Sequence, residues 1–220
     1  MKKGQNLIKR LVLFFIGMII IQFGVSLFLK LNIGSDPFTV FNQGIAFLLN
    51  ITPGQANIIL LILLTFTILV VKKSYINIGT IICVFGVGPI IDLALYCVSY
   101  IKIDSYNIFT KSLLLILVSF IIAVGFSILA ETNLGVAPND SIYFIVKDKI
   151  NIEYRWARIG IDICYLIIGY LCGGVVGIGT IISALLTGPF VQICLPYGKK
   201  LVNLIIGKNR IENVDLDLSI

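Results

Sequence analysis

The stretch IGTII at residues 78–82 recurs unchanged at residues 178–182, and a Gly-Pro pair follows in both places, at residues 88–89 and 188–189. Apolar identities arise easily in a chain so rich in isoleucine and leucine, but glycine, proline, asparagine and threonine identities in one order do not. Upstream, the register continues at an offset of 101 residues through further matches, which are Gly24 with Gly125, Asn32 with Asn133, Gly34 with Gly135, Pro37 with Pro138, and Asn50 with Asn151. The sequence therefore predicts two tandem copies of one unit of roughly a hundred residues.

The composition indicates what surrounds these two units. Hydrophobic residues make up 58% of the chain and charged residues only 13%, which is too little polar side chain to cover the surface of a soluble domain. The 17 basic residues outnumber the 11 acidic ones, but they fall in short clusters between apolar runs, where they orient spans and do not form a nucleic-acid interface. We therefore predict an all-α polytopic membrane protein with the lipid bilayer as its partner and no nucleic-acid partner.

Six apolar runs are long enough for helices that cross about 30 Å of hydrocarbon. They are residues 11–29, 55–71, 78–99, 112–130, 159–173 and 178–196. The predicted organisation is a cytoplasmic N-terminus at 1–10, a first repeat at 11–100, a second repeat at 112–198 and a cytoplasmic tail at 199–220.

Two shorter segments, residues 37–50 and 138–150, follow the matched prolines. A helix of this length reaches only about 21 Å, and the second segment carries charges at both ends, so neither is expected to span the bilayer. We predict half-helices that enter the membrane and return, packed on protein or lining a wet cavity. With three spans in each repeat, the second repeat crosses the membrane in the opposite orientation to the first, as in the inverted repeats of many secondary transporters.

The distribution of basic residues predicts the orientation of the chain. With six spans and both termini in the cytoplasm, fourteen of the 17 basic residues lie inside, and Lys30, Lys102 and Lys111 lie outside. An eight-span arrangement gives the same tally, so segment length and not charge favours six spans.

Charged side chains in or beside the spans are candidates for a substrate or coupling site. Asp92 lies in the third predicted span and is matched by Gln192 in the repeat, although it could also mark a helix end at the outer interface. Arg158 and Asp162 share one helix face at i, i+4, where they could form either a structural anchor or a gate.

The starts of the two half-helices provide further candidates. With Pro37 and Pro138 at the first helical positions, Asp36 is predicted at an N-cap and Asp140 in a first turn. Thr39 stands in the first half where Asp140 stands in the second. Because carboxylates already occupy these positive helix ends, a proton or a cationic substrate is at least as plausible as an anion.

The Gly-Pro pairs are candidate hinges. Proline removes one backbone N–H and collides with the carbonyl four residues earlier, so Pro89 and Pro189 are predicted to break their helices at equivalent depths. The candidate hinge positions are Pro37, Gly88, Pro89, Pro138, Gly188 and Pro189.

The turn motifs NIGSDPF from Asn32 and NLGVAPNDS from Asn133 each precede a Gly-Thr run that ends in Gly-Pro. This pattern resembles the YczE/YyaS/YitT-like family of bacterial membrane proteins over residues 11–196, with the greatest similarity to the YczE branch. The resemblance implies a multi-pass protein of the bacterial cytoplasmic membrane without an established substrate. Some members are linked to lipopeptide or antibiotic production in Bacillus-like bacteria, which implies export or an accessory role. The first half departs from the family pattern at Thr39, where an acidic residue is usual.

These observations lead us to expect a transporter-like protein that moves a small polar or amphipathic solute, with proton coupling as one mechanism. The alternative is a non-transporting accessory protein that stabilises or recruits a partner complex, and a homodimer or a membrane partner protein is an expected assembly. An enzyme is not expected, because the chain has no phosphate-binding loop and no nucleophile beside a base. With no histidine and no CxxC pair, no metal site or cofactor is predicted.

Overall fold

The computed structural model describes residues 2–103 and 105–206. Within these ranges the chain forms α-helices, one 3-10 turn and no strand. The helices are α1 (Lys2–Leu31), α2 (Pro37–Leu49), α3 (Pro53–Lys72), α4 (Ile78–Ser99), α5 (Ile108–Glu131), α6 (Pro138–Ile150), α7 (Tyr154–Leu171) and α8 (Ile178–Ile206), with the 3-10 turn η1 (Lys73–Tyr75) between α3 and α4. The prediction of an all-helical protein is confirmed.

Among the described helices, α1, α3, α4, α5 and α8 are long and apolar enough to cross a membrane. The remaining predicted span, residues 159–173, falls on α7, which has 18 residues and carries Arg155, Arg158 and Asp162 in its first half. Helices α2 and α6 have 13 residues each and coincide with the two predicted half-helices to within one residue. Each has a proline at its first position and ends at an asparagine in the left-handed conformation, Asn50 or Asn151.

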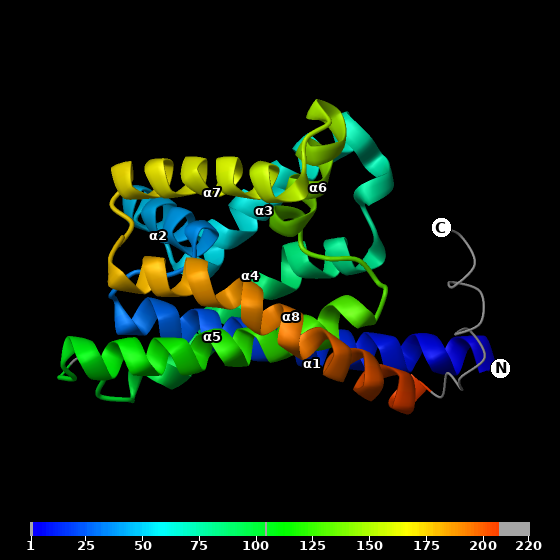
Figure 1. The fold of residues 1–220 in the computed structure, drawn as a ribbon, viewed down its shortest axis with the longest axis horizontal. Helices are drawn as coiled ribbons and strands as arrows, with labels where there is room; N and C mark the ends of the chain where they lie inside the picture. The colour runs from blue at the N-terminus through cyan, green and yellow to red at the C-terminus, as the bar shows by residue number, and fades with distance from the viewer. Residues whose placement is uncertain (1, 104, 207–220) are drawn as a thin grey trace.

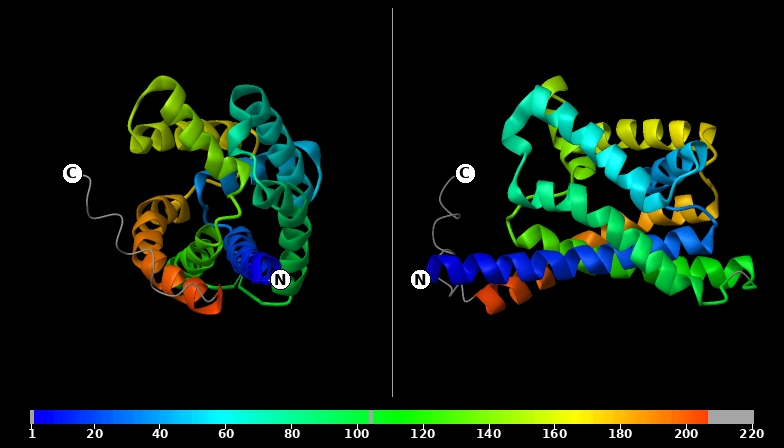
Figure 2. Two further views of the ribbon diagram at one scale, coloured as in Figure 1. Left: turned by 90° about the vertical axis from the view of Figure 1, so that its right-hand side faces the viewer. Right: turned by 180° about the vertical axis from the view of Figure 1, so that it is seen from behind.

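The long helices α1, α4, α5 and α8 lie along the longest dimension of the molecule (Figure 1). Helix α1 packs against α4 and α5, and α5 packs against α8. The other helices form a second group, in which α2 packs against α7 and α3 packs against α6. Each of the two 13-residue helices therefore contacts a helix from the opposite half of the chain, α2 contacting α7 and α6 contacting α3. Figure 2 shows the same two groups down the long axis and from behind.

The Asn-x-Gly turns connect the two halves of the chain. The backbone N–H of Gly79, at the start of α4, donates to the carbonyl of Leu134 at 2.8 Å, and the N–H of Gly179, at the start of α8, donates to the carbonyl of Ile33 at 2.9 Å. Gly34 has a φ of 98°, and a Cβ there would lie 2.5 Å from the Thr180 hydroxyl oxygen, so this turn requires glycine. Each turn thus docks on the helix start of the other half, which explains why both motifs recur in the sequence.

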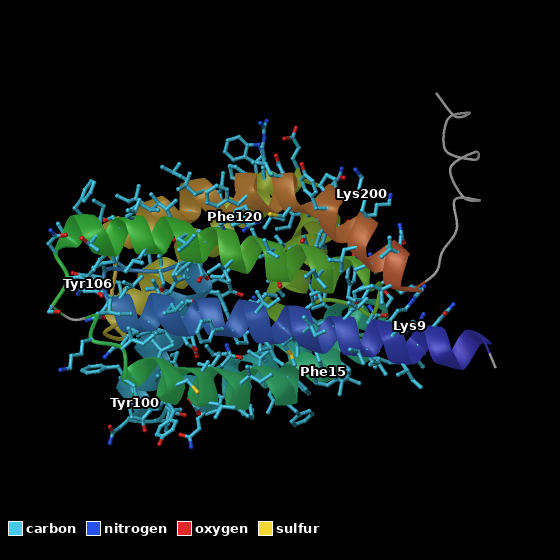
Figure 3. The ribbon with its side chains drawn as sticks, turned by 90° about the horizontal axis from the view of Figure 1, so that it is seen from below. Lys9, Phe15, Tyr100, Tyr106, Phe120 and Lys200 are labelled. Atoms are coloured by element: carbon cyan, nitrogen blue, oxygen red, sulfur yellow. The ribbon has the colours of Figure 1, made fainter. Side chains whose placement is uncertain are left out.

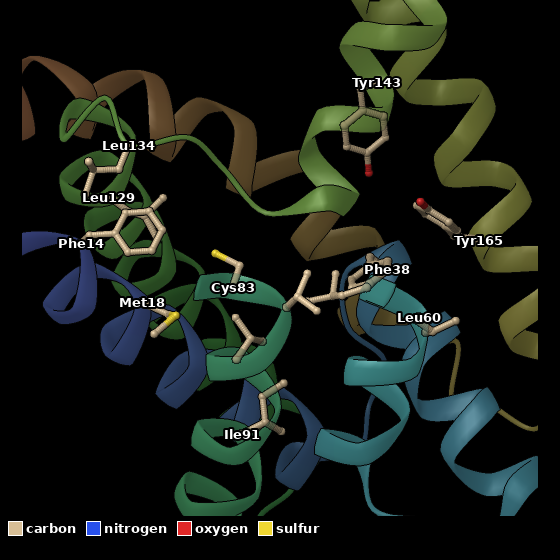
Figure 4. Packing of buried hydrophobic residues seen from close by; sticks show 13 residues of the cluster. Phe14, Met18, Phe38, Leu60, Cys83, Ile91, Leu129, Leu134, Tyr143 and Tyr165 are labelled. Carbon is tan, nitrogen blue, oxygen red and sulfur yellow. The ribbon is translucent and has the colours of Figure 1, made fainter. Parts of the chain in front are cut away.

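The main core lies where α1, α4 and the α5–α6 connection meet α2, α3, α6 and α7 (Figure 4). Phe14 and Met18 of α1 are fully buried there against α4, and Tyr143 and Tyr165 border the same core from α6 and α7. The outer faces of the helices also expose large apolar side chains (Figure 3). Phe15 and Phe120 are each 43% exposed, as expected for side chains that face lipid.

The Gly-Pro pairs do not break their helices. Helix α4 continues through Pro89, and α8 continues through Pro189 and Pro196 to Ile206, so the predicted breaks are wrong. A membrane helix tolerates proline where neighbouring groups or local adjustment satisfy the freed carbonyl. Helix α8 also covers the first part of the predicted tail, of which residues 207–220 lie outside the described residues.

Candidate functional site

Four of the residues predicted from the sequence lie together between α2, α6 and α7. The carboxylates of Asp36, Asp140 and Asp162 each interact electrostatically with the guanidinium of Arg158. Asp140 and Asp162 also interact with Asp36, so the carboxylates are close enough to repel one another. Together with Tyr143, these residues are called the central cluster below.

The two half-helices direct their N-termini at the central cluster. Asp36 is the N-cap of α2, and its carboxylate accepts the backbone N–H of Thr39 at 3.1 Å, as predicted. Helix α6 has Pro138 at its first position and no side-chain hydrogen bond at its cap, and Asp140 lies in its first turn. The carboxylates therefore sit where exposed backbone N–H groups stabilise negative charge.

Helix α7 supplies the remaining charges of the central cluster. Arg158 and Asp162 lie one turn apart, with 3.7 Å between Arg158 Nε and Asp162 Oδ2. The Tyr143 hydroxyl of α6 donates to Asp162 Oδ1 at 2.7 Å, and the Arg158 guanidinium lies 5.6 Å from the centre of the Tyr143 ring. One face of α7 thus contacts α6 through a hydrogen bond and a cation–π contact, while the Arg158–Asp162 ion pair lies within α7.

Two tyrosines of the site were missed from the sequence. The Tyr143 hydroxyl points toward Tyr165 (Figure 4), and the Tyr165 ring stacks on Phe41 with 5.3 Å between ring centres and meets Phe38 edge-on. Tyr165 follows Asp162 by three residues and therefore lies on the same face of α7. This spacing could have identified Tyr165 as part of the site. Tyr143 follows Asp140 by three residues in the same way.

The central cluster carries more negative than positive charge beside the main core, and its Arg158 side chain is 46% exposed. Asp36, Asp140 and Asp162 are half-buried, and Tyr143 and Tyr165 belong to the main core. Within the described part of the chain, no group donates a hydrogen bond to the Asp140 carboxylate. Unpaired charge is costly in such surroundings, so this arrangement favours a bound proton or cation.

Most of the buried side-chain atoms without a hydrogen-bond partner among the described residues lie in the first half of the chain, and Thr187 Oγ1 lies in the second. The side-chain oxygens of Asn42 and Asn57 and the Ser35 hydroxyl are buried and have no hydrogen-bond partner among the described residues. The register of the repeat matches Asn42 with Tyr143 and Asn57 with Arg158. The first half therefore holds neutral amides where the second half holds a phenol and a guanidinium, and their free oxygens need water or another donor.

Asp92 lies elsewhere and has an identifiable structural contact. Its carboxylate accepts the Thr52 hydroxyl at 2.6 Å and the Gly54 backbone N–H at 2.9 Å, so it caps the start of α3 from α4. Its match, Gln192, is exposed on α8. Asp92 therefore caps α3 and does not belong to the central cluster, and within the described residues Gln192 makes no hydrogen bond to it.

The two candidate Gly-Pro hinges differ in their surroundings. A Cβ built on Gly88 would lie 2.5 Å from the Gly54 carbonyl oxygen, because α3 and α4 meet backbone to backbone there. A Cβ built on Gly188 would have no atom within 4 Å. Equivalent sequences therefore occupy a tight contact in one half and open space in the other.

A cavity of about 220 Å³ lies between the ends of α3 and α6, lined by Val71, Lys72, Ile145, Asp148 and Lys149. Asp148 accepts hydrogen bonds from Lys72 Nζ at 2.8 Å and from the Tyr75 hydroxyl at 2.9 Å. These two donors hold the pKa of the Asp148 carboxyl below its ordinary value of 3.8. This ion pair joins α6 to α3 at the periphery, away from the central cluster.

The chain matches a family described as a family of unknown function (DUF6198) over residues 8–196. It is 27% identical over 205 residues to the uncharacterized membrane protein YczE of Bacillus subtilis, covering 93% of this chain and 94% of that protein. It is 27% identical over 187 residues to the uncharacterized protein YyaS of the same organism, covering 82% and 90%, and 25% identical over 179 residues to an uncharacterized protein of Haemophilus influenzae, covering 80% and 78%. No solved structure matches the chain. Because the match spans most of the sequence, this multi-pass membrane protein belongs to the family of unknown function DUF6198 and is related to YczE and YyaS.

Proposed function

We propose that the protein is a gradient-driven transporter of the bacterial cytoplasmic membrane, which moves a small polar or amphipathic solute through the central cluster. The observation that carries this proposal is the convergence of Asp36, Asp140 and Asp162 on Arg158. One of these carboxylates comes from the first half of the chain and the others from the second. Broken or short helices whose N-termini meet between two halves are a recurring design of secondary transport sites.

The proposed architecture has six spans, with α7 added to the five apolar helices. Support comes from the chain directions, because Gly17 of α1 lies beside Gly125 of α5, whereas Gly24, further along α1, lies beside Ile122, which comes earlier in α5. The matched helices α1 and α5 then run in opposite directions, as inverted repeats require. Arg158 and Asp162 are compatible with a span because they pair with each other and Asp162 accepts the Tyr143 hydroxyl of α6, although the start of α7 is largely exposed.

The proposed orientation places both termini in the cytoplasm. Lys9 and Lys200 lie toward one end of the molecule, and Tyr100 and Tyr106 lie toward the other (Figure 3). Basic residues favour the cytoplasmic side, and tyrosines are frequent at membrane interfaces. No ATP-binding motif occurs in the sequence, so the proposed energy source is an ion gradient.

Asp140 is the proposed proton or cation carrier of the central cluster. It is the carboxylate that accepts no hydrogen bond from a described group, and it faces two other carboxylates with Arg158 as their shared cation. In water-poor surroundings a proton or a cation on this side chain relieves the repulsion. Loading and release of that charge would change how strongly α6 is held to α7.

Flux in proteoliposomes tests the proposal. The purified protein is reconstituted with and without a pH gradient and offered a panel of labelled metabolites and lipopeptides. We expect gradient-dependent uptake that Asp140→Asn abolishes and Asp140→Glu partly restores, while the control Glu131→Gln, which removes a carboxylate at the end of α5, leaves uptake unchanged. Uptake by Asp140→Asn at the wild-type rate would overturn the role of Asp140. Activity seen only when a partner complex is present would favour the accessory function instead.

A further inference from the structure

Two helices each present a carboxylate and a tyrosine to the central cluster. Asp140 and Tyr143 lie three residues apart on α6, and Asp162 and Tyr165 have the same spacing on α7. Arg158 uses one carboxylate and one tyrosine, because its Nε lies 3.7 Å from Asp162 Oδ2 and its guanidinium lies 5.6 Å from the centre of the Tyr143 ring. The other two groups, the Asp140 carboxylate and the Tyr165 hydroxyl, make no hydrogen bond among the described residues.

Tyr165 is an unpartnered polar side chain at the edge of the core. The residue is only 7% exposed, and Figure 4 shows its hydroxyl directed toward Tyr143. The phenol is close enough to the carboxylates of Asp140 and Asp162 to interact electrostatically with both. A buried hydroxyl without a partner is costly, so this group needs a ligand that can donate or accept a hydrogen bond.

The surroundings of Tyr165 suit an organic cation better than a metal ion. In residues 2–103 and 105–206, no group of three or more His, Cys, Asp or Glu side chains is placed to hold a metal ion. Aromatic rings adjoin the carboxylates instead, because the Tyr165 ring stacks on Phe41 with 5.3 Å between ring centres and meets Phe38 edge-on at 5.4 Å. A carboxylate beside aromatic rings binds the charge of an organic cation at one end and its apolar body at the other.

We infer that the transported solute is a protonated amine with an apolar group, and that it replaces a proton on Asp140. The ammonium N–H groups donate to the Asp140 carboxylate and to the Tyr165 hydroxyl oxygen, and the apolar group lies against Phe38 and Phe41. As the amine binds, the Asp140 carboxyl releases its proton to water, so the net charge of the site stays the same. The inference rests on the proposed function and specifies an exchange of amine for proton.

Every element packed around Asp140 determines how this exchange depends on pH. The groups that interact with its carboxylate are Arg158, Asp162 and Tyr165 of α7, Asp36 at the start of α2, Cys83 of α4 and Tyr143 of α6 itself. Helix α3 also packs on α6, but its Lys72 is paired with Asp148 at the other end of α6. Arg158 is the cation of this described set, so a proton and an ammonium group compete for the remaining negative charge. Amine binding should therefore weaken as the pH falls.

Binding to the purified protein in detergent tests the inference without flux. The probes are butylamine and phenethylamine, and the controls are phenethyl alcohol and phenylacetate, which keep the phenyl ring and change the charge. Equilibrium dialysis of the labelled compounds measures affinity, with protein-free micelles as the blank, and an indicator dye in weakly buffered solution counts released protons. We expect the amines alone to bind, with release of up to one proton per amine. Where Asp140 carries a proton, affinity should fall by up to about tenfold for each unit of pH.

Three variants separate a ligand contact from a structural role. Asp140→Asn should lower amine affinity by about tenfold or more and abolish proton release. Tyr165→Phe removes only the hydroxyl and should lower affinity by roughly three- to tenfold while proton release persists. Asp148→Asn makes the same change as Asp140→Asn on the same helix, away from the central cluster, and should alter neither quantity.

The wild-type protein alone can overturn the inference, whatever the variants do to folding. It is wrong if neither amine binds more tightly than phenethyl alcohol, or if phenylacetate binds as tightly as phenethylamine. Wild-type affinity and proton release in Asp140→Asn would also refute it. Amine binding without any flux would count against the transport proposal alone, whereas flux of neutral or anionic solutes without amine binding would count against this inference alone.

Discussion

Alanine at the two matched glycines, Gly88 and Gly188, should have opposite effects on stability. Alanine at Gly88 places a methyl group 2.5 Å from the Gly54 carbonyl oxygen and 2.5 Å from a side-chain carbon of Ile58. Alanine at Gly188 meets no atom within 4 Å. The substitution is chemically the same and precedes a proline in both helices, so each variant is the control for the other.

The structure gives the size of the difference. Ordinary contact distances of about 3.5 Å require α3 and α4 to separate by roughly 1 Å, which would stretch the 2.6 Å bond between Thr52 and Asp92 to the limit of a hydrogen bond. Overpacking costs about 1–3 kcal/mol and the weakened bond about 1 kcal/mol. The higher helix propensity of alanine relative to glycine offsets about 1 kcal/mol of this cost. Gly88→Ala should therefore destabilise by about 1–3 kcal/mol, whereas Gly188→Ala should stabilise by up to about 1 kcal/mol.

Circular dichroism at the helix band in a mild detergent measures this difference as a melting temperature. For a chain of this size, about 2–4 °C corresponds to each kcal/mol, so a difference of about 1–4 kcal/mol separates the two melting temperatures by roughly 2–16 °C. Equal melting temperatures would show that the α3–α4 contact does not exist or does not matter. A lower melting temperature for Gly188→Ala would mean that α8 is packed where the structure leaves it open.

Three further predictions follow from other contacts. Tyr143→Phe removes the 2.7 Å hydrogen bond to Asp162 and should lower the free energy of unfolding by about 1–2 kcal/mol in denaturant titrations, whereas Tyr165→Phe, whose hydroxyl has no bond among the described residues, should cost less. Because the pKa of Asp148 is lowered from 3.8, its stabilising effect is present above that pH and is lost as the pH falls below it, so the melting temperature of wild type should fall more steeply from pH 5 to pH 3 than that of Asp148→Asn. Single cysteines at Ser74 and Val176 should react with a membrane-impermeant maleimide from the cytoplasm and from outside, respectively, and external labelling at Ser74 would refute the six-span arrangement in favour of eight spans.

The short helices were predictable because their boundaries are written in local sequence. Proline at the first helical position and asparagine at the end are signals that need no tertiary context, and they placed α2 and α6 to within one residue. Asp36, Asp140, Arg158 and Asp162 were predictable as candidates because charge is expensive at membrane depth. That they interact with one another depends on how α2, α6 and α7 pack, which no local pattern contains.

Contacts between distant segments account for what the sequence did not reveal. Asp92 was proposed as a functional residue only because a charge inside a span is costly. In the structure it caps a helix that begins at Pro53, in another part of the chain. Pro89 and Pro189 were predicted to break their helices, but both helices continue through them. The loss of a backbone N–H at proline is visible in the local sequence, whereas the neighbouring groups that satisfy the freed carbonyl are not. The register of the repeat also predicted equal roles for Gly88 and Gly188, and their surroundings differ.

The unequal chemistry of the two halves indicates one site per chain. If both halves had kept the same side chains, a two-fold arrangement would give two equivalent sites related by the axis. Instead, the positions that carry charge or a phenol in the second half are neutral in the first, where Thr39 matches Asp140, Asn42 matches Tyr143, Asn57 matches Arg158 and Leu61 matches Asp162. The charges therefore gather on α6 and α7, and α7 is the helix that lacks a packed neighbour on the α8 side. A proton or cation that binds the central cluster thus acts directly on α7 and its contacts with α2 and α6, whereas the matched helix α3 has neutral residues at these positions and is held to α4 by Asp92.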